Sequence, residues 1–300
     1  MIFSSELGEP EGPVALPDGS WLVVEMAPER GCVSHVAPDG SVRRILQTGR
    51  PNGLAVDGDG RIWVAESQRR ALLVVSRSGE VQAEITGPAD TPFLFPNDVA
   101  FGPDGALYLT DSGIHTADFF ADGDIRANYA ALRYDGRVYR VDPADGTVTT
   151  LDTGIRFTNG LAFDARGDLF VNETMTGMIF RYRLSQGSSG RENFANVLDP
   201  SVPTRYRGPD GMAFDVDGRL YCTVYGQGDV TVVEPDGTVS RRIPTAGSRP
   251  TNVAFGANGE SRIYVTEVGR GALEMYDVPA PGLPLHAPAA ARPGRAEPSS

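Results

Sequence analysis

The chain has 300 residues, of which the 36 glycines and 23 prolines make up about a fifth. Such a content is too high for a helical bundle and is typical of many short strands joined by turns. The formal net charge of −12 argues against a nucleic-acid partner, which would need a basic face. No apolar run is long enough to span a membrane, and residues 1–11 show no signal-peptide pattern, so we expect a cytoplasmic protein.

Residue types that are missing exclude several kinds of chemistry. All 27 basic residues are arginine, so no lysine is present to form a Schiff base or to hold pyridoxal phosphate. The two cysteines, Cys32 and Cys222, form no CxxC motif, and the sequence has no P-loop and no GxSxG motif. A three-histidine zinc site would need His286 from the tail, and we do not expect one.

One segment of the sequence recurs six times, at intervals of 41, 45, 62, 51 and 41 residues. Each copy has two short apolar runs, and in the first five copies a glycine lies between them, eight residues after the start. Alternating runs around an Asp-Gly turn are typical of a β-hairpin. The six copies begin at Glu11, Asn52, Asn97, Asn159, Asp210 and Thr251.

A second hairpin pattern follows the repeated segment, for example from Arg137 and from Asp229. Two hairpins make a four-stranded unit, and the spacing is close to that of propeller blades. We therefore predict an all-β fold: one six-bladed β-propeller over residues 1–278 with four-stranded blades, in which an N-terminal strand closes the last blade. We expect the Pro/Ala-rich residues 279–300 to be disordered.

The first residues of the six copies are the strongest candidates for a functional site. The innermost strand of a blade begins where the connections between blades arrive, so these residues should ring one mouth of the central channel. Their carboxylates and amides are oxygen ligands that hard cations prefer. The alternative is that Asn-Gly and Asp-Gly serve here as turn and capping residues. Because such side chains would be costly to leave unpaired, we predict one divalent cation.

Other polar residues have weaker signals. A second acidic set ends the second strand of most copies, and we interpret it as structural: Glu25, Glu66, Asp111, Glu173 and Glu267. Asp98 is a candidate partner of its neighbour Asn97. The 62-residue interval leaves about twenty extra residues between Ser112 and Arg137, which we expect to form a loop or short helix over one face.

The motifs resemble the senescence-marker protein/gluconolactonase/regucalcin-like family of six-bladed propellers, which is related to diisopropylfluorophosphatase-type enzymes. The resemblance covers about residues 6–278 and is carried by EGP from Glu11, PNDVAFGPDG from Pro96, TNGLAFD from Thr158 and GPDGMAFD from Gly208. It implies that one divalent cation is bound by Glu11, Asn97, Asn159 and Asp210. Ca²⁺ is the favoured ion, with Mg²⁺, Mn²⁺, Zn²⁺ and Fe²⁺ as alternatives.

Two positions depart from the patterns of the resembling enzymes. Phe95 stands where sugar lactonases of this kind often have an arginine, two residues before the first metal-binding asparagine. Val268 stands where the phosphatase-type relatives have a histidine. The first departure favours a lactone less polar than an aldonic one, and the second disfavours an organophosphate.

The predicted function is hydrolysis of a lactone or related ester, with the cation as Lewis acid and Asp210 as general base or, as an alternative, nucleophile. The residues expected to contact substrate are Asn52, Phe95, His115, Tyr129, Tyr225 and Asn252, with residues 114–134 as a lid. The alternatives are a non-hydrolytic propeller enzyme acting on a small metabolite and a non-catalytic propeller that binds calcium or a partner. We expect a small-molecule substrate, no nucleic-acid or membrane partner, and a monomer or weak dimer.

Overall fold

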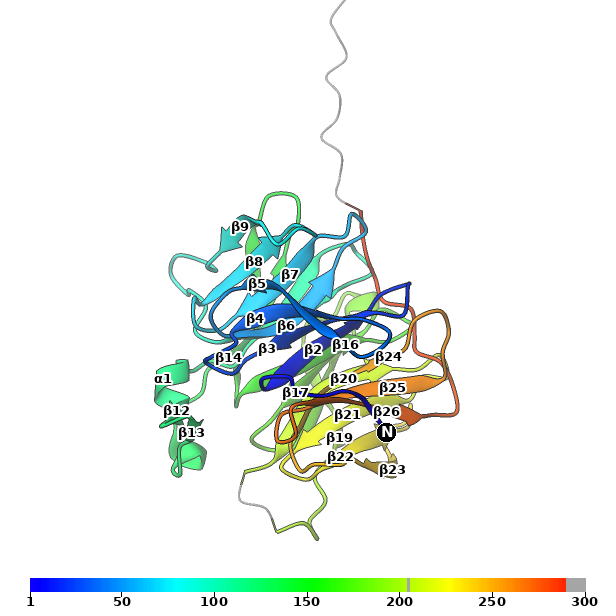
Figure 1. Cartoon of the computed structure of the whole chain (residues 1–300). Coiled ribbons are helices and arrows are strands. Elements are labelled where there is room, and N and C mark those ends of the chain that lie inside the picture. Colours follow the sequence, from blue (N-terminus) through cyan, green and yellow to red (C-terminus); the bar gives the residue numbers. More distant parts are fainter. Residues whose placement is uncertain (204–205, 290–300) are drawn as a thin grey trace, which may run out of the picture.

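The computed structural model describes residues 1–203 and 206–289 of the chain. These residues form six antiparallel four-stranded sheets that are arranged as blades around a central channel (Figure 1). The first strand of each blade contacts the first strands of both neighbouring blades, so these strands are innermost. The predicted six-bladed β-propeller is therefore confirmed.

The first five blades each take four strands in chain order, apart from two short strands inserted in blade 3. Blades 1 and 2 are β2 (Pro10–Ala15), β3 (Trp21–Glu25), β4 (Cys32–Val36), β5 (Val42–Gln47), and β6 (Pro51–Val56), β7 (Ile62–Glu66), β8 (Ala71–Val75), β9 (Val81–Ile85). Blades 3 and 4 are β10 (Pro96–Phe101), β11 (Leu107–Asp111), β14 (Gly136–Val141), β15 (Val148–Ile155), and β16 (Thr158–Phe163), β17 (Leu169–Glu173), β18 (Met178–Tyr182), β19 (Arg191–Asn196). Blade 5 is β20 (Gly208–Phe214), β21 (Leu220–Tyr225), β22 (Asp229–Val233) and β23 (Val239–Pro244).

Blade 6 joins the two ends of the chain. Its strands are β24 (Pro250–Phe255), β25 (Arg262–Glu267), β26 (Ala272–Asp277) and, at the outer edge, β1 (Ile2–Ser4). The backbone amide of Met275 donates to the Met1 carbonyl at 2.8 Å, and the Ser4 hydroxyl donates to the Gly40 carbonyl of blade 1 at 2.8 Å. The N-terminal strand thus closes the ring by hydrogen bonds, as the sequence predicts.

Aromatic pairs hold neighbouring blades together. In each pair, an aromatic residue of one blade's second strand packs edge-on against the last residue of the next blade's first strand. The ring centroids are 4.9 to 5.9 Å apart in the four pairs, which are Trp63–Phe101, Tyr108–Phe163, Phe170–Phe214 and Tyr221–Phe255. Edge-to-face packing at these distances is the favoured geometry for aromatic rings. The repeated aromatic positions in the sequence are therefore the contacts between blades.

The extra residues of blade 3 form a small subdomain on one side of the ring. It contains α1 (Thr116–Phe119), the hairpin β12 (Phe120–Ala121) and β13 (Asp124–Ile125), and the 3₁₀ turn η1 (Tyr129–Ala131) (Figure 1). A further 3₁₀ turn, η2 (Leu184–Gln186), lies between β18 and β19. Among the described residues, no helix has the length and apolar character that crossing a membrane requires.

The C-terminal segment differs from our expectation. Residues 279–289 lie against the side of the ring opposite to the small subdomain, where the segment is drawn in red in Figure 1. The amide of Leu283 donates to the Phe214 carbonyl at 2.8 Å, and the Gly58 amide donates to the Pro288 carbonyl at 3.0 Å. These residues thus contact two blades that are distant in sequence, although their composition predicts disorder. Residues 290–300, covered by the same prediction, lie outside the described residues.

Candidate active site

A cavity of about 450 Å³ opens at the end of the channel where the six first strands begin, which we call the upper mouth. The first residues of all six repeat copies line it: Glu11, Asn52, Asn97, Asn159, Asp210 and Thr251. Successive first strands run in the same direction around the channel, so residues in phase in the repeat meet at the same end. The structure therefore brings together the side chains that the repeat identified.

Two asparagines of this ring are held by hydroxyl groups from their own blades. Asn97 Nδ2 donates to Ser112 Oγ at 2.9 Å, and Asn159 Nδ2 donates to Thr174 Oγ1 at 3.1 Å. Each hydroxyl in turn donates to a backbone carbonyl of the next blade at 2.9 Å. Because the amide nitrogen faces the hydroxyl, the amide oxygen lies on the opposite side of the group. Both asparagines line the cavity, and each amide oxygen is an acceptor of the kind that binds a hard cation.

Glu11 and Asp210 are the two acids of the ring. Glu11 is 3% exposed and accepts hydrogen bonds from the Gly12 amide and, at 2.9 Å, from Asn252 Nδ2. Burial raises the pKa of Glu11 well above its usual range, and the charges of Asp210 and Asp98 raise it further. Burial and the Asp98 charge raise the pKa of Asp210 in the same way, while a hydrogen bond from Asn159 opposes the rise.

Asp98 is a third buried acid, and it lies below the ring formed by the first residues of the six copies. Its carboxylate accepts a hydrogen bond from the Val99 amide at 2.9 Å, and burial raises its pKa to about 6. Three buried carboxyl groups that repel one another are unstable as anions unless a positive charge balances them. This electrostatic arrangement favours binding of a cation at the upper mouth.

The donor set fits a hard divalent cation. Glu11 and Asp210 offer two carboxylates, and Asn97 and Asn159 offer two oriented amide oxygens, all of which are oxygen ligands. Within the described part of the chain, no cluster of three or more His, Cys, Asp or Glu side chains has the spacing of a metal site. The candidate set contains two acids and two amides, so this finding does not concern it.

The second acidic set has a structural role. Its members accept hydrogen bonds from backbone amides of the segment that enters the same blade; these pairs are Gly8–Glu25, Arg50–Glu66, Leu94–Asp111, Arg156–Glu173 and Arg249–Glu267. A carboxylate that accepts amide hydrogens fixes the path of the backbone at that point. These residues therefore position the start of each first strand.

One wall of the upper cavity is aromatic. Phe95, Phe119, Phe120 and Phe157 pack together, with ring centroids 4.7 to 6.4 Å apart for the pairs in contact. Tyr206 and Tyr225 continue the wall at a centroid distance of 5.6 Å. The small subdomain supplies Phe119 and Phe120, so the wall depends on the residues inserted in blade 3.

The residues expected to contact substrate fall into two groups. Asn52, Phe95 and Tyr225 line the upper cavity, whereas His115, Tyr129 and Asn252 are not among its lining residues. Tyr129 packs on Tyr206 with ring centroids 5.0 Å apart, and His115 precedes α1, since the inserted residues pack around their own aromatic cluster. Asn252 lies below the ring, where it binds Glu11.

Several lining residues were missed by sequence reasoning, above all Arg50, Arg249 and Tyr206. Both arginines stand two residues before the first residue of their repeat copy, which is Asn52 for Arg50 and Thr251 for Arg249. The arginine that recurs at one position of the repeat is therefore a signal by which both residues can be found in the sequence. Tyr206 lies outside the repeated segment, so the repeat carries no signal for it.

A closed six-bladed propeller with an oxygen-lined mouth defines the class of this protein, and sequence comparison gives the family. The model of the SMP-30/gluconolactonase/LRE-like region matches residues 9–269, so the chain belongs to that family. Pentonolactonase XacC of Haloferax volcanii is 30% identical over 279 residues, which cover 89% of this chain and 83% of that protein.

Two further similarities agree with this assignment. A gluconolactonase of Zymomonas mobilis is 27% identical, over 87% of this chain and 76% of its own length. The solved structure of XC5397 from Xanthomonas campestris, described as a gluconolactonase, is 26% identical with a TM-score of 0.75, covering 93% of this chain and 88% of that one. The similarity therefore extends over nearly the whole propeller.

Proposed function

We propose that this protein hydrolyses lactones and that the upper mouth is its active site. The observation that carries the proposal is the convergence of two acids and two oriented amides at the floor of a cavity of about 450 Å³, a size that suits a small molecule. Relatives named as lactonases, similar over most of the chain, support the same reaction class. The cytoplasmic location and the monomeric or weakly dimeric state stay predictions.

The proposal includes one divalent cation held by Glu11, Asn97, Asn159 and Asp210, with calcium favoured. All four residues line the cavity, and the two carboxylates balance the charge of the ion. When bound, the cation supplies Lewis-acid polarisation of the substrate carbonyl group. Ser112 and Thr174 contribute by holding the amide groups of Asn97 and Asn159 in one orientation.

Asp210 is the proposed general base. It is more accessible than Glu11, Asn97 and Asn159, which are 3 to 5% exposed, so it is the acid that a water molecule in the cavity can reach. Its carboxylate takes a proton from this water as the oxygen adds to the acyl carbon. The ring C–O bond then breaks, and the proton passes to the departing ring oxygen, which leaves a hydroxy acid.

The aromatic wall restricts the substrate. Phe95, Phe120 and Phe157 offer no hydrogen-bonding group to the hydroxyls of a sugar lactone. A buried hydroxyl without a partner is costly, so the wall favours a lactone with an apolar face. We therefore propose a substrate less hydroxylated than an aldonic lactone.

A panel of lactones followed by pH-stat titration tests the proposal. We expect metal-loaded protein to open at least one lactone, chelator-treated protein to lose activity, and Asp210→Asn to lose about 10²-fold or more in kcat with the cation still bound. Asp236→Asn is the matched control, because Asp236 caps an exposed turn through Thr238. Full activity after chelation, or wild-type turnover by Asp210→Asn, would contradict the mechanism. Stoichiometric cation without any turnover would favour the non-catalytic alternative.

A further inference from the structure

Arg50 lines the upper cavity, but the proposed reaction gives its side chain no role. It precedes β6 and lines the cavity beside the aromatic wall. Its guanidinium carbon lies 4.7 Å from the ring centroid of Phe120 and 5.5 Å from that of Phe95. Cation–π contacts of this kind hold the planar group in a defined orientation.

The Arg50 guanidinium has few polar partners. Its Nη1 donates to Ser67 Oγ at 3.3 Å, and Ser67 Oγ donates to the Arg50 carbonyl at 2.8 Å. Glu66 is engaged by backbone amides of Arg50 and Arg69. Considering only the residues that the structure describes, Arg50 takes part in no salt bridge. A partly buried guanidinium thus has donor groups left for a ligand.

Two arginines stand one position earlier in the repeat, three residues before the first residue of their copy, and each donates to a backbone carbonyl. Arg156 Nη2 donates to the Ala130 carbonyl at 3.1 Å, and Arg207 Nη1 donates to the Asp199 carbonyl at 2.8 Å. Neither residue is among those that line the upper cavity. Arg50 therefore differs from these two arginines in its access to the site, which it shares with Arg249, the arginine at the same position of blade 6.

The Arg50 guanidinium keeps its positive charge in this cavity. Burial lowers the pKa of Arg50, whereas the charges of Glu9, Glu66 and Glu11 raise it, and a guanidinium stays protonated throughout. Glu9 and Asp124 also line the cavity, and both side chains are exposed to water. Arg249, on the other side of blade 1, adds a second positive charge to the rim.

We propose that Arg50 is a specificity-determining residue that binds a carboxylate carried by the substrate lactone. This inference rests on the proposed lactone hydrolysis. A guanidinium presents parallel N–H groups that match a carboxylate, and the interaction is strong where aromatic rings exclude water. The lactone ring lies between Arg50 and Asp210, with its carbons against Phe95 and Phe120. The substrate class is then a lactone with a free carboxylate and few hydroxyl groups.

Two lactones of equal size separate charge recognition from ring opening: 5-oxotetrahydrofuran-2-carboxylate and its neutral carboxamide. We expect wild-type kcat/KM to be at least about 10-fold higher for the carboxylate, an advantage that shrinks with added salt. In Arg50→Gln we expect kcat/KM for the carboxylate to fall about 30-fold or more, mainly through a higher KM. The fall in kcat/KM for the carboxamide should be much smaller. Arg50→Lys should recover part of this loss. Arg69→Gln, whose side chain pairs with Glu84 away from the cavity, is the matched control.

Binding of 2-hydroxyglutarate, the ring-opened product of the carboxylate lactone, provides a readout that does not depend on turnover. Calorimetry should show binding to metal-loaded wild type and at least about 10-fold weaker binding to Arg50→Gln. Equal kcat/KM for carboxylate and carboxamide, or equal losses in Arg50→Gln, would overturn the inference while lactone hydrolysis stands. Absence of any ring opening by the wild type, with product binding still dependent on Arg50, would overturn only the proposed reaction.

Discussion

The two ends of the channel are built from the same six strands, but the residues at the two ends of each strand differ in chemistry. The first residue of each copy lines the upper mouth, and the residue four positions later lines a cavity of about 590 Å³ at the opposite end, the lower mouth. The lower residues are Ala15, Val56, Phe101, Phe163, Phe214 and Phe255. Each strand therefore has one polar and one apolar end.

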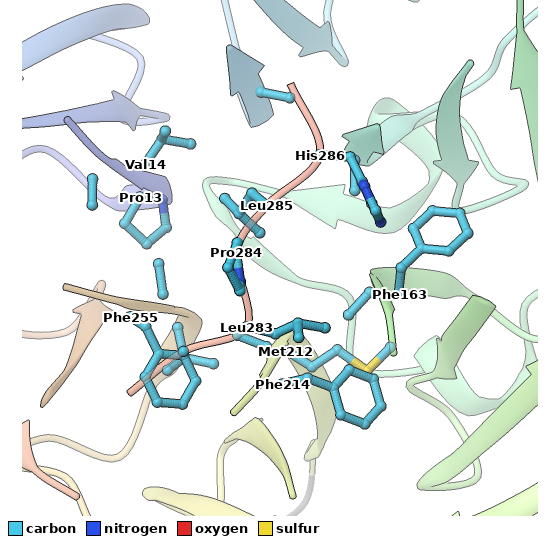
Figure 2. A pocket seen from close by; sticks show the side chains of 18 of the residues that line it. Pro13, Val14, Phe163, Met212, Phe214, Phe255, Leu283, Pro284, Leu285 and His286 are labelled. Carbon is cyan, nitrogen blue, oxygen red and sulfur yellow. The ribbon is translucent and has the colours of Figure 1, made fainter. Parts of the chain in front are cut away.

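The chain itself covers the apolar end. Figure 2 shows Leu283, Pro284 and Leu285 crossing the lower mouth, with the His286 ring beside that of Phe163. The two ring centroids are 6.2 Å apart. The upper mouth is lined by polar groups that suit a cation and a substrate, whereas the lower mouth is closed by the C-terminal segment. The comparison predicts that changes at the upper mouth alter chemistry and that changes at the lower mouth alter stability.

Removal of one upper-mouth acid should have the largest effect. Glu11→Gln keeps the size of the side chain but removes one of the two carboxylates proposed to balance the cation. We expect cation affinity, measured by calorimetry, to fall about 10²-fold or more. The metal-free variant should be as stable as the wild type or more so, because a buried acid with a raised pKa is removed. Unchanged cation affinity in Glu11→Gln would place the ion elsewhere.

Deletion of residues 279–300 tests the lower mouth. It exposes the apolar lining residues and removes the backbone hydrogen bonds that Leu283 and Pro288 make with blades 5 and 2. We expect the free energy of unfolding to fall by about 2–4 kcal/mol, measured by urea denaturation, with cation affinity within about twofold of the full chain. Deletion of residues 290–300 alone is the control. If the longer deletion lowers cation affinity and leaves stability unchanged, the assignment of chemistry to the upper mouth and of stability to the lower mouth is wrong.

The pH dependence of stability distinguishes the acids of the upper mouth from ordinary surface acids. Glu11, Asp98 and Asp210 have raised pKa values in the folded protein, with that of Asp98 about 6. Between the unfolded and folded pKa values, the folded state binds more protons, so stability falls as pH rises. We expect metal-free protein to be more stable at pH 5 than at pH 7, by on the order of 2 kcal/mol.

Calcium should reverse this trend, because the cation favours the ionised carboxylates and gains affinity as they deprotonate. Thermal unfolding with and without calcium at both pH values measures the effect. Asp98→Asn should flatten the slope of the metal-free protein. Metal-free protein that gains stability from pH 5 to pH 7 would show that the three acids are already balanced by other groups.

The repeat in the sequence predicts the blades, the closure by residues 1–5 and the six residues that line the upper mouth. Phase suffices for the blades and for the ring of residues, since in-phase residues of successive first strands must meet. The closure follows instead from the last copy, which lacks a fourth strand of its own. Contacts made by segments outside the repeat are not contained in the phase. Residues 279–289 have a low-complexity composition, yet Leu283 is placed by a cavity that several blades form together. The position of Tyr129 likewise depends on Tyr206, which lies outside the repeat.

The smallest predicted effect concerns the hydroxyl groups that orient the two asparagines. Ser112→Ala removes the acceptor that holds Asn97 Nδ2, and Thr174→Ala does the same for Asn159. The amide can then turn its nitrogen toward the cavity, so we expect cation affinity to fall about 10-fold in each variant, with little change in the unfolding curve. Ser67 occupies the same place in blade 2, where its hydroxyl donates to the backbone of Arg50.

Ser67→Ala is therefore the matched control, since it removes a hydroxyl from the same position of a blade without touching either asparagine. Calorimetric titration with calcium should give wild-type affinity for Ser67→Ala and reduced affinity for the other two variants. Equal affinities for all three would mean that Asn97 and Asn159 keep their orientation without the hydroxyls. A loss confined to Ser112→Ala or to Thr174→Ala would assign the amide ligation to one asparagine. The cation would then be bound from one side of the upper mouth, by the two acids and a single asparagine.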